Sequence, residues 1–315
     1  MFGRMPPALV LTLAIVAGAA MDATIKHLAQ TNPVLLVTFG RYLFGSFFSA
    51  LIWWHAGHPA ITKEMWRAHG LRGFVIAISA VAFFWSLSVL PLAEAVTLSF
   101  IYPLLAPFVA AVVLKERVRP KSVICALVGF AGVIVAMQGA PNEAESPEHD
   151  LGVIAALVAA TFFSLAMVLL RERAQKDGPV IVSLMTSVVP ALILFLPTLL
   201  LVTHASALVN GAFGTNLPVF AAALAFDEWW FFLQLGALAA VFMYLMAQAY
   251  ARAEAQQLAP IHYTELIYAS LFGLLIFHET PRVQIYLGAA LIIAACLWAA
   301  YDERRLAAKP KESAS

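Results

Sequence analysis

Charged residues are scarce in this 315-residue sequence, at only 12%, whereas hydrophobic residues make up 62%. Soluble domains carry about 25% charged residues, and a water-soluble fold of this length cannot hide so much apolar surface. The mean hydropathy is +0.86. The scarcity of charge excludes an ordinary soluble domain and indicates that lipid surrounds most of the chain.

The sequence also lacks the signatures of catalysis, metal binding and nucleotide binding. It contains no His-Glu-x-x-His, Gly-x-Ser-x-Gly or Walker-type motif. The two cysteines, Cys125 and Cys296, lie in apolar runs without the spacing of metal ligands, which favours buried small side chains over a disulfide. The net charge of +1 provides no basic surface for nucleic acid. We therefore expect no enzyme, no cofactor and no metal site.

Long apolar runs fill most of the chain. A bilayer core of roughly 30 Å requires about 20 apolar residues per helix. On this basis the sequence predicts ten spans, at 8–28, 34–54, 71–90, 92–114, 121–139, 151–170, 180–202, 229–250, 257–277 and 283–301. The runs lack the alternation of a barrel strand, so the spans are expected to be helices.

Two segments need separate interpretation. The N-terminal run resembles a signal peptide, but it continues past the small residues Ala17–Ala20, so we interpret it as an uncleaved first helix. The stretch from His204 to Glu228 contains an apolar piece too short to span. It is interpreted as a periplasmic lid or interfacial segment.

Basic residues predict the orientation. With a cytoplasmic N-terminus, the cytoplasmic segments hold 16 of the 19 basic residues, at Arg4, Lys63, Arg67, Arg72, Lys115, Arg117, Arg119, Lys121, Arg171, Arg173, Lys176, Arg252, Arg304, Arg305, Lys309 and Lys311. Only Lys26, Arg41 and Arg282 fall elsewhere. This positive-inside pattern predicts that both termini are cytoplasmic in a multi-pass protein of a bacterial inner membrane.

An internal repeat appears when the sequence is shifted by 163 residues. Leu90–Arg119 and Ala253–Arg282 each contain a long apolar helix that ends at one glutamate, Glu116 or Glu279, beside a short basic turn. Each half has five spans, and because five is odd, the second copy must be inverted in the membrane relative to the first. Inverted repeats are common among secondary transporters. We therefore expect repeats at 8–139 and 151–301, followed by a cytoplasmic tail at 302–315.

A family resemblance rests on particular motifs. The segment Leu90-Pro91-Leu92-Ala93-Glu94-Ala95, the later Phe100-Ile101-Tyr102-Pro103-Leu104, and Leu114-Lys115-Glu116-Arg117 before Gly129-Phe130-Ala131-Gly132 resemble the EamA domain of the drug/metabolite transporter superfamily. The second half ends similarly at Phe277-His278-Glu279 before Gly288-Ala289-Ala290. The resemblance implies an all-α membrane protein of ten helices in two inverted five-helix repeats, and a secondary carrier of metabolites.

Ionisable side chains at bilayer depth are costly, so each is a functional candidate. Glu265 lies near the middle of the ninth span, with His262 and Tyr268 one turn to either side, and the 163-residue shift places it opposite Tyr102. Its carboxylate could bind a cationic substrate group or carry a coupling proton. A structural pair with Arg41 or His262 is the alternative. Tyr102-Pro103 mark an expected break in the fourth span.

Four further charges lie within the first four spans. Arg41 could contact a substrate carboxylate or pair with Asp22 or Glu94. Asp22 and Lys26 lie four residues apart and could form a local ion pair, or Lys26 could extend to the interface. Glu94 could line the mouth of a cavity or stabilise a helix start.

The remaining candidates are weaker. Trp85, Tyr244 and Tyr263 could stack on a substrate in the cavity or anchor the protein at the membrane interface. Glu116 and Glu279 are interpreted as structural caps or pairs at helix ends, and Pro103 as a structural break.

These features predict a transporter that moves a zwitterionic or cationic metabolite, such as S-adenosylmethionine or an amino acid. The Pro-Leu-Ala-Glu-Ala turn resembles bacterial S-adenosylmethionine or riboflavin importers, so a vitamin importer and a drug or amino-acid exporter remain alternatives. A channel or an intramembrane enzyme is disfavoured. The expected partners are the lipid bilayer, a small-molecule substrate and a coupling proton, in a monomer or a homodimer.

Overall fold

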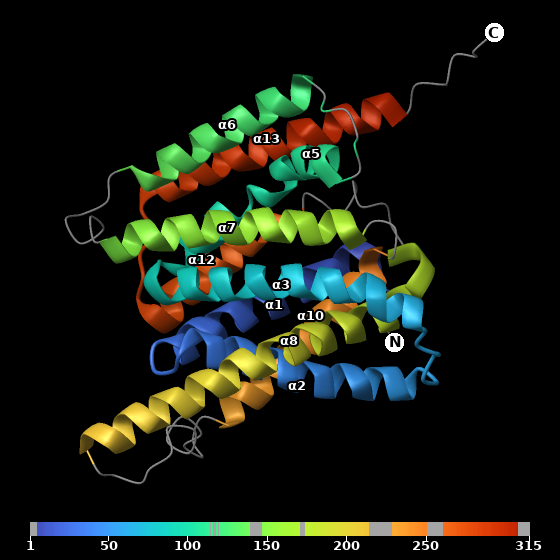
Figure 1. The fold of residues 1–315 in the computed structure, drawn as a ribbon. Helices are drawn as coiled ribbons and strands as arrows, with labels where there is room; N and C mark the ends of the chain where they lie inside the picture. The colour runs from blue at the N-terminus through green and yellow to red at the C-terminus, as the bar shows by residue number, and fades with distance from the viewer. Residues whose placement is uncertain are drawn as a thin grey trace.

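A computed structural model describes residues 5–113, 115, 118, 120–138, 147–170, 174–213, 229–250 and 261–307. Within these ranges the regular secondary structure is entirely helical. The helices are α1 (Pro7–Ala29), α2 (Val34–His55), α3 (Lys63–Val89), α4 (Leu92–Ser99), α5 (Tyr102–Val113), α6 (Pro120–Met137), α7 (Pro147–Leu170), α8 (Ala174–Phe213), α10 (Trp229–Tyr250), α12 (Glu265–Phe277) and α13 (Val283–Ala307) (Figure 1).

The described part contains eight helical stretches long and apolar enough to cross a membrane, with α4 and α5 forming one of them. Two shorter apolar helices, Glu265–Phe277 and Val283–Ala299, occupy the positions of the last two predicted spans. The sequence therefore predicts the helical membrane class correctly.

Two helices extend beyond their predicted limits. Helix α3 begins at Lys63 rather than at residue 71, with the Thr62 hydroxyl accepting a hydrogen bond from the Met65 amide. Helix α8 runs on to Phe213, so residues 204–213 continue this helix instead of forming a separate lid. Residues 214–228 lie outside the described ranges. Near its start, α8 is interrupted at Gly178, whose φ of 74° is one that glycine adopts without strain.

The predicted break in the fourth span is present. Helix α4 ends at Ser99 and α5 begins at Tyr102, with Phe100 and Ile101 between them. Backbone hydrogen bonds between residues three apart close the turn. In one of them the Ile101 amide donates to the Leu98 carbonyl at 3.3 Å. Pro103 lacks an N–H and is best accommodated in the first turn of a helix, which is where the new start at Tyr102 places it.

A related break occurs at the start of α12. The backbone turns at Tyr263 and Thr264, and the helix then begins at Glu265. The Thr264 amide bonds to the Ile261 carbonyl at 3.0 Å, which tightens this turn. Tyr102 and Glu265 are related by the 163-residue shift, so the second part of each broken segment starts at the same position of the repeat.

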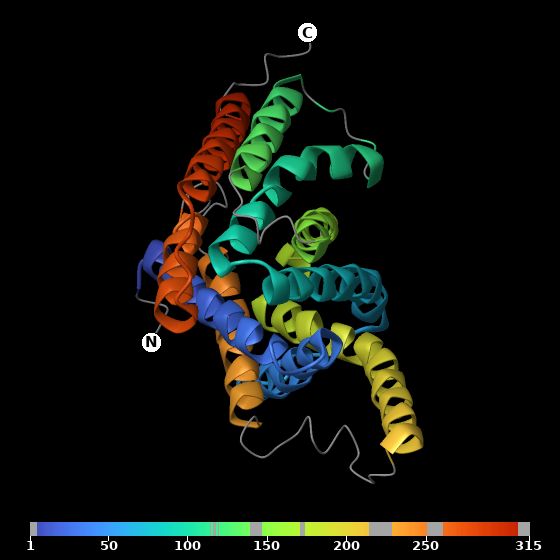
Figure 2. The same ribbon diagram turned by 90° about the vertical axis from the view of Figure 1, so that its left-hand side faces the viewer.

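Helices from the first half of the chain pack against helices from the second half. Helix α1 packs against α10 and α12 of the second half, and α7 packs against α3 and α5 of the first half. Helices α2 and α8 pack together, as do α6 and α13 (Figures 1 and 2). At the last pair the backbones approach so closely that a side chain at Gly288 would collide with the Gly132 carbonyl. Small residues allow such contact where apolar burial from water does not drive association.

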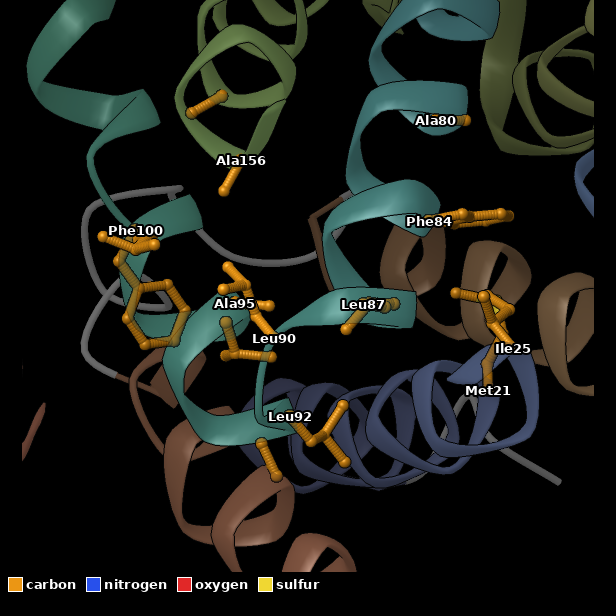
Figure 3. Packing of buried hydrophobic residues seen from close by; sticks show 14 of the residues in the cluster. Met21, Ile25, Ala80, Phe84, Leu87, Leu90, Leu92, Ala95, Phe100 and Ala156 are labelled. Atoms are coloured by element: carbon orange, nitrogen blue, oxygen red, sulfur yellow. The ribbon is translucent and has the colours of Figure 1, made fainter. Parts of the chain in front are cut away.

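A hydrophobic cluster surrounds the turn between α3 and α4. Leu87, Leu90 and Leu92 are almost completely buried there. Figure 3 shows them above α1, which contributes Met21 and Ile25. This cluster joins the turn to α1, while α4 itself packs mainly against α12 and α7.

Candidate substrate-binding site

The break between α4 and α5 contacts the turn that precedes α12. The rings of Phe100 and Tyr263 meet edge to face, with centroids 5.6 Å apart and planes at 89°. The thiol of Cys296 lies 3.7 Å from the Phe100 carbonyl oxygen, which the helix break leaves available as an acceptor. Interrupted backbone at membrane depth requires such partners, because lipid offers none.

Glu265 lies at the first position of α12, directly after this contact, and is half-buried. A carboxylate is favourable there because the N-terminus of a helix carries partial positive charge. The side chain interacts electrostatically with Asp22 of α1, which is 4% exposed. Asp22 also interacts with Arg41 of α2, which is 6% exposed. The tertiary structure thus gathers two carboxylates and one guanidinium from three helices.

Arg41 is oriented by its neighbour in the chain. Its guanidinium carbon lies 4.0 Å from the centroid of the Tyr42 ring, within cation–π range. Its Nε atom is buried and has no hydrogen-bond partner among the residues that the structure describes. One donor of this side chain is therefore available to a ligand.

The other residues predicted to accompany Glu265 are His262, Tyr268 and Tyr102, and they lie in different surroundings. His262 lies just before the turn that leads to Glu265, and Tyr268 packs with α1 residues Leu11 and Ala14 in a second apolar cluster. Tyr102 instead packs edge to face on Phe163 of α7, with centroids 4.9 Å apart. Tyr102 and Glu265 are therefore repeat-related but have different neighbours, an aromatic ring in one half and a carboxylate in the other.

Trp85, Pro103 and Tyr244 complete the predicted set. Trp85 is half-buried on α3, and Pro103 is half-buried in the first turn of α5. Tyr244 accepts a 3.3 Å hydrogen bond from Gln248 on α10. An apolar cleft of about 380 Å³ beside Tyr244 is lined by Leu51, Ile52, His55, Ala56 and Val180. This cleft lies at the C-terminal end of α2, and Glu265 and Asp22 do not line it.

Glu94 is enclosed in a network of charges. Its side chain is 1% exposed, with one oxygen 3.0 Å from Nε2 of His149 and the other 3.1 Å from Nη2 of Arg282. These partners come from α7 and from the turn before α13. Both carboxylate oxygens are thus engaged by the opposite half of the chain.

Lys26 also pairs across the halves. Its Nζ lies 2.6 Å from Glu279 and donates a 2.5 Å hydrogen bond to the Leu90 carbonyl. The second oxygen of Glu279 accepts a 2.9 Å hydrogen bond from the Leu92 amide, which begins α4. Lys26 therefore forms its ion pair with Glu279 and not locally with Asp22. The Glu279 side chain stabilises the start of α4, while its backbone amide bonds to the Gly273 carbonyl at the end of α12. Glu116 lies outside the described residues.

Sequence reasoning missed a second buried polar cluster, between α3 and α8. Arg72 is 2% exposed and donates a 2.8 Å hydrogen bond to the Thr186 hydroxyl. One turn earlier, Nε2 of His69 lies 3.1 Å from Asp177. The positive-inside pattern counted Arg72 among the residues of a cytoplasmic segment, whereas the side chain lies within α3, which begins two turns before it, and is covered by α8. Its spacing from His69 on one helical face was the available signal.

Within the described ranges, no group of three His, Cys, Asp or Glu side chains is arranged to hold a metal ion. Long apolar helices that enclose charged side chains define a multi-pass helical membrane protein. Residues 5–138 and 150–301 both match the model of the EamA-like transporter family. The chain belongs to this family and is a transporter of the drug/metabolite type.

Similar proteins span nearly the same length. The S-adenosylmethionine uptake transporter of Rickettsia bellii is 24% identical over 298 residues, covering 94% of each chain. The riboflavin transporter of Rhizobium johnstonii is 28% identical, covering 96% of this chain and 93% of the relative. A crystal structure with 21% identity superposes with a TM-score of 0.58 and covers 95% of this chain and 97% of the other, which shows a shared fold.

Proposed function

We propose that this protein is a secondary-active carrier that moves a zwitterionic or cationic metabolite across a bacterial inner membrane by alternating access. The single observation that carries the proposal is the cluster of Asp22, Arg41 and Glu265 beside a helix break. A site with both charge signs inside an apolar bundle suits a substrate that bears both signs. S-adenosylmethionine and amino acids have this chemistry.

The proposed architecture is ten helices in two inverted repeats, 8–139 and 151–301, with both termini cytoplasmic. The starts of α5 and α12 at related positions support it, as do the exchanged neighbours of α1 and α7. In inverted repeats the substrate site lies where the broken helices meet, near the midplane. The contact between Phe100 and Tyr263 marks that place.

Two neighbouring carboxylates and one guanidinium leave an excess of negative charge when all are ionised. Like charges in a low-dielectric site favour the uptake of a proton or of a cationic group. Asp22 and Glu265 could therefore bind either the substrate cation or a coupling proton. Exchange of the proton for the substrate cation would couple proton movement to substrate movement.

Riboflavin is the second candidate substrate. The aromatic pairs Phe100 with Tyr263 and Tyr102 with Phe163 place four rings at the helix breaks. Rings of this kind suit a flat heterocycle, and several relatives are riboflavin transporters.

Uptake into proteoliposomes tests the proposal. We expect labelled S-adenosylmethionine to accumulate with saturation and to show counterflow against unlabelled substrate. Glu265→Gln should reduce the initial rate at least roughly tenfold while the protein remains folded, because charged hydrogen-bonding partners contribute about 1.5–3 kcal/mol. Glu148→Gln on the exposed start of α7 is the matched control and should transport normally.

The outcomes separate the alternatives. Saturable uptake of riboflavin without S-adenosylmethionine uptake would replace the first substrate with the second. Non-saturating flux without counterflow would indicate a channel. Normal transport by Glu265→Gln would remove Glu265 from the site.

A further inference from the structure

Arg72 and Arg41 are two deeply buried cations whose donors are incompletely used. Both Nε atoms are buried, and neither has a hydrogen-bond partner in the described part of the chain. From their shared neighbour Tyr42 we propose that Arg41, Tyr42, Arg72 and Thr186 form a buried anion site that receives the carboxylate of the transported metabolite. This inference rests on the proposed carrier function and specifies one end of its substrate.

Arg72 is held between two helices. It lies in the third turn of α3, where the Thr186 hydroxyl of α8 accepts a 2.8 Å hydrogen bond from it. Thr186 also donates to the Val182 carbonyl at 2.6 Å, so its hydroxyl is held in position. A neutral hydroxyl orients a guanidinium but does not balance its charge.

Tyr42 connects the two arginines. It is 3% exposed and interacts electrostatically with both Arg41 and Arg72. Arg41 lies on the face of its ring, at 4.0 Å from the centroid. Tyr42 therefore links two guanidinium groups on α2 and α3, one by a ring contact and the other by electrostatic interaction.

The energetic argument is one of charge balance. Buried charges in proteins are normally paired, because an unpaired ion loses its hydration without compensation. Arg41 interacts electrostatically with the Asp22 carboxylate, whereas within the described residues the partners of Arg72 are the neutral side chains of Tyr42 and Thr186. A ligand carboxylate would supply the missing negative charge. Arginine suits this role because its planar fork matches two carboxylate oxygens.

The site also explains substrate polarity. Asp22 interacts electrostatically with both Arg41 and Glu265, and Tyr42 interacts electrostatically with both Arg41 and Arg72. A zwitterion would place its cationic group toward the two carboxylates and its carboxylate toward the two arginines. A substrate without a carboxylate would leave Arg72 unpaired.

Stability gives a test that needs no knowledge of the substrate. Arg72→Met preserves much of the side-chain length and removes the charge. If Arg72 is kept for a ligand, the melting temperature of the ligand-free variant in detergent should equal or exceed that of wild type, because an uncompensated buried charge has been removed. Arg67→Met, on an exposed position of the same helix, is the control. A marked fall for Arg72→Met alone would overturn the proposal and make Arg72 structural.

Ligand discrimination gives the second test. S-adenosylmethionine and its decarboxylated form differ in the proposed anion only. We expect wild type to bind the carboxylate form at least roughly tenfold more tightly, and Arg72→Met to lose this preference while Arg67→Met keeps it. Equal binding of the two forms by wild type, or retained preference in Arg72→Met, would overturn the anion site. Binding of neither form would count against this substrate under the proposed function, and the stability test would then decide on the site alone.

Discussion

Phe100 and Tyr263 are related by the 163-residue shift, and their rings pack edge to face with centroids 5.6 Å apart. Each residue lies in the break of its own broken segment, just before α5 or α12. The contact therefore joins the two halves at the point where both backbones are interrupted. Movement of one half relative to the other must change or pivot on this contact.

The aromatic contact should be measurable as a coupling. Phe100→Leu and Tyr263→Leu are each expected to destabilise the protein, and the double variant by less than their sum, with a coupling of about 1 kcal/mol. Melting of the four proteins in detergent provides the cycle. Strict additivity would show that the rings contribute independently.

The pair of Lys26 with Glu279 predicts an asymmetric mutational pattern. Lys26→Met leaves a partly buried carboxylate without its cation, which should cost about 3–5 kcal/mol. The double variant Lys26→Met with Glu279→Gln should recover part of this loss because no unpaired charge remains. Thermal unfolding measures both, with the exposed Lys63→Met as control. A double variant less stable than Lys26→Met would contradict a simple ion pair.

The close approach of α6 and α13 makes Gly288 sensitive to a single methyl group. A Cβ there would lie 2.4 Å from the Gly132 carbonyl oxygen, so Gly288→Ala must separate the helices and is expected to lower the melting temperature. Gly70→Ala is the matched control, since a Cβ at Gly70 meets no atom within 4 Å. That change should be neutral or stabilise α3 by up to about 1 kcal/mol.

Asp22 and Glu265 should behave as one functional unit. Asp22→Asn is expected to reduce uptake at least roughly tenfold, and the double variant with Glu265→Gln should be little worse than either single change, because groups that act together are not additive. Initial rates in proteoliposomes provide the comparison, with reconstitution checked by protein content. If the rate of the double variant instead fell by the product of the two single-variant factors, the carboxylates would act at independent steps.

The broken fourth span was readable from Tyr102-Pro103, because proline permits a helix start there and disfavours continuation. Glu265 was found as a candidate because a carboxylate far from either span end is unusual in an apolar segment. Its position at a helix start was not predicted, since the turn at Tyr263 and Thr264 contains neither proline nor glycine.

The sequence by itself determined the class of this protein, since long runs without charge can only be helices in lipid. It also predicted a repeat, and residues 5–138 and 150–301 both match the EamA-like transporter family. Only the tertiary structure decided that Lys26 pairs with Glu279 rather than Asp22, and that Arg72 is covered by α8. The physical reason is that helical periodicity specifies which residues share a face, whereas the neighbour of that face depends on how distant helices pack together.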